Sequence, residues 1–371
     1  MQVVRADLDE LELPLVHPFE TSFGIERQRQ ILIVRLHTKS GEVGYGECVA
    51  SRDPGYSSET VATARWAIGE LVLPWLLRQT KVDLTSFTRA FVPVRGHAMA
   101  KAAIEMALWD LVGRERRRSL SQLLGGNRPR VEVGVSVGIQ PSVAALVEAV
   151  GTYVTAGYRR VKLKVKPGWD SAPVGAVRRA YPNLRLWVDA NQAYSPRDAG
   201  RVRSWAGKFE VEQVEQPFSE RSIDAHARLQ RGSAFRVCLD ESIVDDASLE
   251  DAMHRRALRS VNIKSGRVGG LAPAIRLGRS AARGDLKVWV GGMLETGIGR
   301  AANLALASTA PFDWPGDLSA SDRYYADDVI TRPFRLGPGS TLEVPTGPGL
   351  GIEVDARTYR RYRMRRTVRR R

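Results

Sequence analysis

Cysteine is scarce in this chain. Only two of its 371 residues are cysteines, Cys48 and Cys238, and they lie far apart and form no CxxC pair. This scarcity argues against a disulfide-rich secreted scaffold and favours a reduced, cytoplasmic setting. No apolar run reaches the roughly 18 residues of a membrane span. The acidic N-terminal segment MQVVRADLDELELP also lacks the basic start and apolar centre of a signal peptide. The sequence therefore predicts no membrane partner.

Histidine is scarce as well. The five histidines are scattered, and none has the spacing of zinc ligands. No GxGxxG motif follows the first strand of the alternating region described below, which weakens a dinucleotide-binding alternative. The chain does have a balanced composition, with 43% hydrophobic and 26% charged residues. That balance is typical of a globular protein with one large barrel or several ordinary domains.

Acidic residues are outnumbered, and the formal net charge is +15. Nine arginines and no acid lie between residues 357 and 371, so only +6 remains for the other 356 residues. One interpretation is a nucleic-acid-binding tail, with arginines on phosphates and with Tyr359 and Tyr362 stacked on bases. The alternative, which we favour, is a frayed and solvated terminal segment, because blocks of like charge at termini are commonly disordered. We therefore expect no nucleic-acid partner.

The first 125 residues predict an α+β domain. The segments ILIVRLHT (31–38) and EVGYGECV (42–49) flank a short Lys-Ser-Gly turn, which is the pattern of a β-hairpin. Two later segments, 58–78 and 98–116, have the apolar spacing of helices. The segment HPFETSFG (17–24) fits neither pattern. Its aromatic residues belong either to a mobile lid or to a loop anchored on a core.

Strand-like and helical segments alternate strictly from residue 126 to about residue 325. Strands are predicted to begin near residues 131, 160, 185, 212, 235, 260 and 287, with an eighth at 311–317. Seven strand–helix units and a closing strand fit a (β/α) barrel better than an open doubly wound sheet.

A charged residue stands at the C-terminal end of each of five successive strands. These residues are Lys164, Asp189, Glu215, Asp240 and Lys264. Active sites of this kind of barrel lie at that end of the strands. Because side chains alternate along a strand, position within each strand predicts that all five point into the barrel. The two lysines would then lie on the second and sixth strands and face each other across the mouth.

Three carboxylates without a nearby histidine or cysteine are the ligands of a hard cation. Mg²⁺ is the expected ion and Mn²⁺ a substitute. A divalent ion beside a lysine base suits the removal of a proton α to a carboxylate, because the ion stabilises the enediolate that forms. The sequence therefore predicts an enzyme that acts on a small-molecule carboxylate.

Motifs spread over nearly the whole chain carry a family resemblance. They are PFETSFG (18–24), GYGECV (44–49), MAKAAIEMALWDL (99–111), GVSVGI (134–139), KLKVKPGWD (162–170), VDAN (188–191), EQP (215–217), CLDES (238–242), NIKSGRVGG (262–270), GGMLETGIGRAAN (291–303), PGDLSASDRYY (315–325) and VPTGPGLG (344–351). In these motifs the sequence resembles the enolase superfamily, muconate-lactonizing-enzyme subgroup. Within that subgroup it resembles the o-succinylbenzoate synthase and N-acylamino acid (N-succinylamino acid) racemase family.

The resemblance implies a (β/α)7β barrel under an α+β capping domain formed by both termini. The cap would comprise residues 1–125 and the barrel residues 126–325. Residues 326–371 would return to the cap and end in the basic tail. The family also leads us to expect a homo-oligomer.

The resemblance also implies a role for individual residues. Asp189, Glu215 and Asp240 would bind Mg²⁺, and Lys164 and Lys264 would be the acid and base on opposite faces of the substrate. The lid would carry Phe19 and Phe23. The implied substrate-binding or supporting residues are Lys162, Ser136, Asn191, Glu241, Arg267, Gly291, Gly292 and Met293.

Two reactions share this machinery. A synthase would dehydrate 2-succinyl-6-hydroxy-2,4-cyclohexadiene-1-carboxylate to o-succinylbenzoate for menaquinone biosynthesis. A racemase would move the α-proton of an N-succinylamino acid between the two lysines. Arg267 matches a position that the family associates with racemase activity, whereas Ser265 stands where relatives commonly have proline. We expect the dehydratase, with racemase activity as a companion or alternative.

Overall fold

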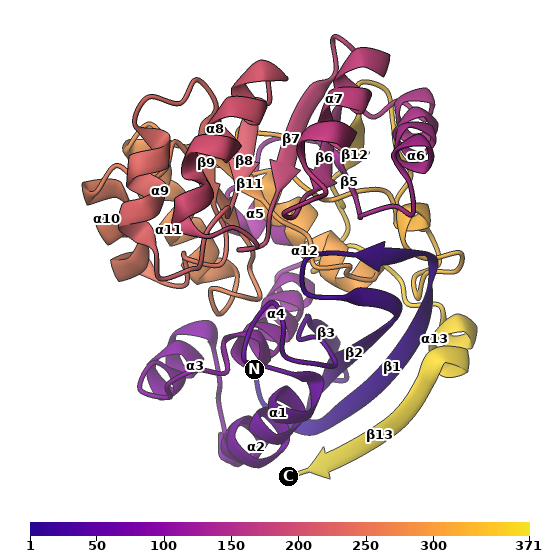
Figure 1. Cartoon of the computed structure of the whole chain (residues 1–371). Helices are drawn as coiled ribbons and strands as arrows, with labels where there is room; N and C mark the ends of the chain where they lie inside the picture. Colours follow the sequence, from indigo (N-terminus) through magenta and orange to yellow (C-terminus); the bar gives the residue numbers. More distant parts are fainter.

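Two sheets of different kinds organise the chain in the computed structural model, which describes residues 1–371 (Figure 1). The first sheet is antiparallel and contains β1 (Val3–Glu20), β2 (Ile25–Thr38), β3 (Val43–Cys48) and β13 (Arg363–Arg370). Its strand order is β13-β1-β2-β3. The predicted hairpin is confirmed, because β2 and β3 pair from Leu32↔Cys48 to His37↔Val43.

Helices cover this antiparallel sheet and form the rest of the cap. They are α1 (Val61–Trp66), the π-helix η1 (Ala67–Val72), α2 (Leu73–Arg78), α3 (Leu84–Phe91), α4 (Ala98–Glu115) and α5 (Leu120–Leu124). The single helix predicted for residues 58–78 is interrupted by a π-helical turn, in which the Leu73 N–H donates to the Ile68 carbonyl. Pro74 follows directly and has no N–H to continue the α-helical pattern.

The second sheet is parallel and curls into the barrel. Its strands are β5 (Val135–Val137), β6 (Arg160–Lys164), β7 (Arg185–Asp189), β8 (Gln213–Glu215), β9 (Arg236–Leu239), β10 (Ser260–Ile263) and β11 (Lys287–Val290). The strands lie in sequence order. The outer helices are α6 (Val143–Thr155), α7 (Ser171–Ala180), α8 (Ala199–Lys208), α9 (Ile223–Gln230), α10 (Asp246–His254), α11 (Leu271–Arg283) and α12 (Gly297–Ala307).

An extended segment at residues 314–317 closes the ring between β11 and β5. The Asp317 N–H donates to the Val290 carbonyl at 3.0 Å, and the Gly134 N–H donates to the Gly316 carbonyl at 2.8 Å. The segment forms only an isolated bridge at Gly316 and no regular strand, but it occupies the eighth position. The predicted (β/α)7β barrel with an α+β cap is therefore confirmed.

The remaining elements are short. They are β4 (Arg130–Glu132), which pairs with β12 (Thr341–Glu343), the 3-10 helices η2 (Pro196–Asp198) and η3 (Ser321–Arg323), and α13 (Ala356–Tyr362). Apolar side chains form one large buried cluster in the barrel and a second in the cap. None of the helices combines the length and the apolar character needed to cross a membrane.

The basic tail is ordered, so the prediction of a frayed terminal segment is wrong. Strand β13 pairs antiparallel with β1 and forms the outer edge of the cap sheet (Figure 1). Arg366 binds Asp9 at 2.7 Å and Arg369 binds Glu70 at 2.7 Å. The prediction failed because the acids that neutralise part of the tail lie far away in sequence, on β1 and η1.

Candidate active site

Strand register brings the predicted charged residues to one rim of the barrel. Lys164 pairs directly with Asp189 across β6 and β7, and Asp189 pairs with Glu215 across β7 and β8. Asp240 comes just after β9, and Lys264 comes just after β10. Strands β6 and β10 are separated by three strands in the sheet, so the two lysines approach from different sides of the barrel.

Each of the three carboxylates binds a lysine ammonium group. Lys164 Nζ lies 2.6 Å from Asp189 Oδ2, and Lys264 Nζ lies 2.6 Å from Asp240 Oδ2. Glu215 is bound at 2.6 Å by Lys162, which therefore points into the barrel like Lys164. All of these groups are buried or nearly so. The rim is thus a compact network of alternating charges.

A fourth carboxylate belongs to this network and was not predicted. Asp317, on the segment that closes the ring, accepts a hydrogen bond from Ser136 Oγ at 3.1 Å and binds Lys162 Nζ at 2.5 Å. It also binds Arg160, whose guanidinium lies 4.3 Å from the centre of the Trp187 ring. Asp317 therefore holds two buried cations in place beneath the rim.

Charge and burial act in opposite directions on these groups. Burial works against the charged form of Lys162, but Asp317, Glu215 and Asp189 raise its pKa well above the usual range. Burial raises the pKa of Glu215 to about 7, with Asp189 adding to the effect. For Asp240 burial is outweighed by Lys264 and Arg267, which lower its pKa. Burial and neighbouring acids therefore work against the charged form of Glu215, whereas nearby cations favour the charged form of Asp240.

The donor chemistry of the rim fits a hard divalent cation. Asp189, Glu215 and Asp240 supply oxygen ligands from three adjacent strands, which is what Mg²⁺ and Mn²⁺ prefer. As the side chains lie here, lysines stand between the carboxylates, and no three acidic, histidine or cysteine side chains are spaced to hold a metal ion. Cation binding at these carboxylates therefore requires the lysine ammonium groups to move off them.

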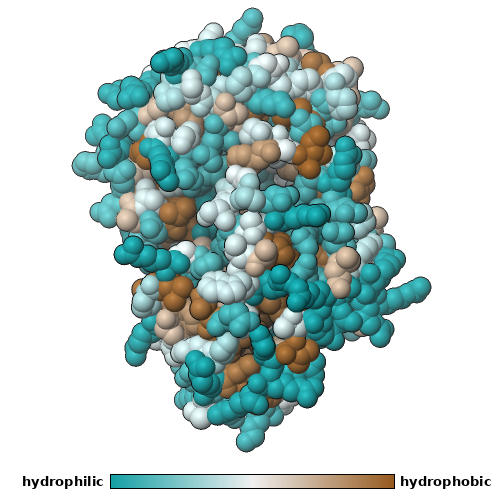
Figure 2. Space-filling view, turned by 60° about the horizontal axis from the view of Figure 1, so that its bottom comes forward, coloured by the Kyte–Doolittle hydropathy of each residue, from teal (hydrophilic) through white to brown (hydrophobic).

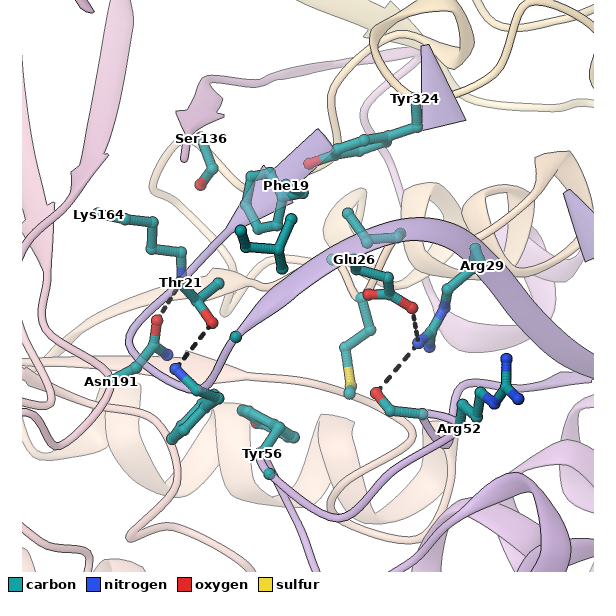
Figure 3. Close-up of a pocket in the computed structure, with 18 of the residues that line it drawn as sticks. Phe19, Thr21, Glu26, Arg29, Arg52, Tyr56, Ser136, Lys164, Asn191 and Tyr324 are labelled. Carbon is teal, nitrogen blue, oxygen red and sulfur yellow. Dashed lines mark hydrogen bonds and ion pairs between the residues drawn. The ribbon is translucent and has the colours of Figure 1, made fainter. Parts of the chain in front are cut away.

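A cavity of about 710 Å³ opens above the rim, between barrel and cap (Figure 3). Ten of the predicted site residues line it, namely Phe19, Phe23, Ser136, Lys162, Lys164, Asp189, Asn191, Lys264, Gly292 and Met293. Five do not reach the cavity surface, namely Glu215, Asp240, Glu241, Arg267 and Gly291. The ten lining residues can contact a substrate, and the other five support these lining residues from behind.

Asn191 connects the cavity wall to Glu241 behind it. Asn191 accepts a hydrogen bond from Lys164 Nζ at 2.6 Å and donates one to Glu241 at 3.2 Å. Burial, together with the charges of Asp240 and Asp189, raises the pKa of Glu241 to about 8. Asn191 adopts a positive φ of 43°, a conformation that asparagine tolerates better than most residues. The Asn191 amide thus helps to hold the Lys164 side chain in place at the cavity wall.

The turn between β1 and β2 closes one side of the cavity. Phe19 is buried and packs edge-to-face on Tyr324, with ring centres 6.2 Å apart. Phe23 is 40% exposed. Ser22 Oγ donates to the Asn191 carbonyl at 2.9 Å, so the turn is docked on the barrel. Phe19 therefore acts as an anchor, and the motion of a lid around Phe23 stays a prediction.

The loop after β3 brings another unpredicted residue to the rim. The Tyr56 hydroxyl donates to Asp240 Oδ1 at 2.8 Å, and its ring lies 4.3 Å from Lys264 Nζ. Arg267 donates to the same hydroxyl at 2.9 Å and binds Asp240 directly. The cap and the barrel therefore meet at one carboxylate. Ser265, by contrast, points away and donates to Asn303 at 2.9 Å.

Comparison with known proteins agrees with this geometry. The chain matches the N-terminal domain model of mandelate racemase / muconate lactonizing enzyme over residues 8–125 and the enolase C-terminal domain-like model over residues 145–358. It is 44% identical to an N-succinylamino acid racemase from Amycolatopsis, with 95% of each chain covered. It is 39% identical to an o-succinylbenzoate synthase from Listeria innocua, covering 98% of this chain and 96% of that protein.

The fold is also shared with solved structures. The crystal structure of an enolase superfamily member from Listeria innocua superposes with a TM-score of 0.94 at 38% identity and covers 99% of both chains. The two family models together cover most of the cap and of the barrel and include all five charged residues of the rim. The chain therefore belongs to the mandelate racemase and muconate lactonizing enzyme family of the enolase superfamily.

Proposed function

We propose that this protein is an o-succinylbenzoate synthase that dehydrates 2-succinyl-6-hydroxy-2,4-cyclohexadiene-1-carboxylate, a step of menaquinone biosynthesis. The observation that carries the proposal is that Lys164 and Lys264 reach one cavity from strands that are not neighbours. A substrate between them has one amine on each face. Relatives that bear the synthase name share 35–41% identity with this chain over nearly their full length.

The dehydration needs one base and one cation. Lys164 removes the α-proton, and the electron pair of the broken C–H bond moves into the carboxylate as an enediolate. The C–O bond then breaks, the ring becomes aromatic, and the departing hydroxide takes the proton back as water. Lys264 stays protonated on the other face and stabilises the negative charge. If the pKa of the lysine lies on the order of 20 units below that of the substrate C–H group, removal of the proton costs about 27 kcal/mol. Lysine alone therefore does not suffice.

The family depends in general on divalent metals, and Asp189, Glu215 and Asp240 would hold Mg²⁺ here, with Mn²⁺ as a substitute. When bound, the ion would stabilise negative charge on the substrate carboxylate. The lysines would then leave the carboxylates and turn toward the substrate. Lys162, held by Asp317, would remain a fixed positive charge below the reacting carboxylate.

Racemisation of N-succinylamino acids is the second candidate. It is favoured by the same two lysines, because a 1,1-proton transfer needs a base on each face of Cα. Arg267 also supports it, since this residue binds Asp240, the carboxylate partner of Lys264. Removal of the proton by one lysine and return by the other would invert Cα without loss of any group.

A paired assay tests both activities. Wild type, Lys164→Ala and Lys264→Ala would be given the cyclohexadiene carboxylate and an N-succinylamino acid, each with Mg²⁺ or with a chelator. We expect both activities to need Mg²⁺ and to fall by at least about 10³-fold in each variant, the range lost with an acid–base group. Lys208→Ala, an exposed lysine on α8, is the control and should retain full activity. Unchanged turnover in Lys164→Ala refutes the proposal.

A further inference from the structure

Six arginines near the C-terminus lack an acidic partner although the elements that carry them are ordered. Of the nine arginines from residue 357 onward, only Arg361, Arg366 and Arg369 lie within ion-pair distance of a carboxylate. The six without such a partner are Arg357, Arg360, Arg363, Arg365, Arg370 and Arg371. They are exposed except for Arg363, which is half-buried. We call these six residues, which lie on α13, on β13 and directly after β13, the arginine edge. Because side chains alternate along a strand, Arg365 and Arg370 project from opposite faces of β13.

Four of the six arginines, Arg363, Arg365, Arg370 and Arg371, lie on or directly after the outermost strand of the cap. Strand β13 has eight residues, so this part of the edge is about 26 Å long at about 3.3 Å per residue. Its end borders a groove of about 670 Å³ against α2. Arg369, Arg370 and Arg371 lie on one side of the groove and Arg78 lies on the other, with Glu70 as the only acid. The surface that Figure 2 brings forward is mainly hydrophilic, with apolar residues in separate small patches.

One cross-strand pair is left electrostatically unfavourable. Arg370 stands directly opposite Arg5 in the antiparallel register of β1 and β13. Arg5 forms an ion pair with Asp7, in which Nε lies 2.7 Å from Oδ1, whereas Arg370 has no carboxylate within 4 Å. Like charges directly opposite each other destabilise a sheet. An anion bound beside Arg370 would offset this repulsion.

Because the arginines are exposed, a polymer with many phosphates should bind them better than a single phosphate does. A single phosphate at an exposed guanidinium binds weakly, because water and salt screen the interaction. A polymer that presents many phosphates sums these weak contacts and releases its condensed counterions. A second copy of this chain is unsuitable, because edge-to-edge pairing of two β13 strands would place arginines against arginines.

The aromatic residues of the tail select between forms of nucleic acid. Tyr359 is buried and donates its hydroxyl to Asp9 at 2.9 Å. The Tyr362 ring is covered by the guanidinium of Arg361, 4.6 Å from its centre. Neither ring is free to stack on a base, which single-stranded nucleic acid requires. Duplex DNA needs no stacking and carries a charge for about every 1.7 Å of its axis.

We propose that the arginine edge binds duplex DNA without sequence preference, through phosphate contacts alone. The 26 Å edge spans about 8 base pairs at about 3.4 Å per pair. This surface lies on the cap and shares no residue with the catalytic cavity. DNA binding and turnover are therefore separate properties that can be lost independently.

Fluorescence anisotropy of a labelled 20-base-pair duplex tests the proposal in 50, 100 and 200 mM NaCl. The test variant is Arg365→Gln, Arg370→Gln and Arg371→Gln combined, which breaks no ion pair to a carboxylate. The control is Arg197→Gln, Arg221→Gln and Arg231→Gln combined, which removes the same charge from the barrel surface. We expect the test variant to lower the slope of log K against log salt by about 2.7, at about 0.9 per contact. We also expect it to bind more than tenfold more weakly than the control at 50 mM NaCl.

Three results would overturn the proposal. They are no binding by wild type at 50 mM NaCl, equal losses in the test and control variants, and tighter binding of a single strand than of the duplex. Thermal melting and turnover are measured in parallel, and both should equal those of the wild type. If the triple variant does not fold, the double change at Arg370 and Arg371 at the end of the strand replaces it, with an expected slope change of about 1.8.

Discussion

Asp317 and Lys162 form an ion pair of 2.5 Å that links the strand closing the barrel to the strand carrying the proposed base. Both side chains are buried, and Asp317 also neutralises Arg160. This one ion pair thus helps to close the ring and also holds a positive charge beneath the proposed substrate.

Asp317→Asn should therefore lower both stability and turnover. The change leaves Arg160 without its carboxylate and Lys162 with fewer negative neighbours, and removing one partner of a buried ion pair costs about 3–5 kcal/mol. Urea unfolding measures the loss. Asp322→Asn, which breaks an exposed pair with Arg335, should cost less than about 1 kcal/mol. Equal losses in the two variants would contradict the role assigned to Asp317.

Tyr56→Phe should weaken the contact between cap and barrel at Asp240. The variant loses a hydrogen bond to a charged acceptor, worth about 1.5–3 kcal/mol, and leaves Arg267 with one acceptor fewer. Differential scanning calorimetry should show a lower melting temperature. Tyr362→Phe at the exposed end of α13 should leave that temperature nearly unchanged.

Mg²⁺ should stabilise the folded protein. Binding to the native rim alone adds about 2.7 kcal/mol when the free ion is at 100 times its Kd. A thermal shift in MgCl₂ compared with NaCl of equal ionic strength measures this effect without any turnover. Asp240→Asn should abolish the shift, and a shift of the same size in that variant would place the ion elsewhere.

Because of His226, the free energy of unfolding should fall as the pH drops below the pKa of free histidine. This residue is fully buried against Phe218, and burial lowers its pKa to about 4. The unfolded chain takes up the proton first, so stability is present above about pH 6.5 and is lost by up to about 3 kcal/mol toward pH 4. His226→Gln should flatten this part of the profile, whereas His254→Gln on the surface should not.

Gly46→Ala should destabilise the cap. A methyl group at residue 46 would overlap the backbone carbonyl of Ala103, where β3 crosses α4. Such overpacking costs about 1–3 kcal/mol or more. Gly200→Ala is the matched control, because nothing lies within 4 Å of the added carbon on α8. It should be neutral or stabilising by up to about 1 kcal/mol, as measured by chemical unfolding.

The barrel and its rim were predictable because their signals are local. A strand recurs every 23 to 29 residues, and alternation within each strand assigns Lys164 and Asp189 to the inner face. Asp317 ends the predicted eighth strand at 311–317, but its contacts with Lys162 and Arg160 arise only when the ring closes, and no local pattern shows them. Tyr56 lies in a loop without periodicity, so no sequence pattern connects it to Asp240.

The error at the tail has a different cause. The sequence shows the density of positive charge after residue 357, and local density predicts repulsion. The backbone of β1 and the carboxylates of Asp9 and Glu70 lie about 300 residues or more away in sequence. Long-range pairing of this kind decides whether the segment is ordered, and a local pattern contains no information about it.

The pairing of β1 with β13 joins two strands that lie about 350 residues or more apart in the sequence. The cap sheet remains one strand short until β13 has been synthesised, while all seven strand–helix units of the barrel are already complete. Premature termination before residue 363 should thus yield a chain with an intact barrel and a cap sheet in which the edge of β1 is unpaired. In such a chain Asp9 loses its contact with Arg366, and in products that also lack Tyr359 it loses the hydrogen bond from that hydroxyl as well.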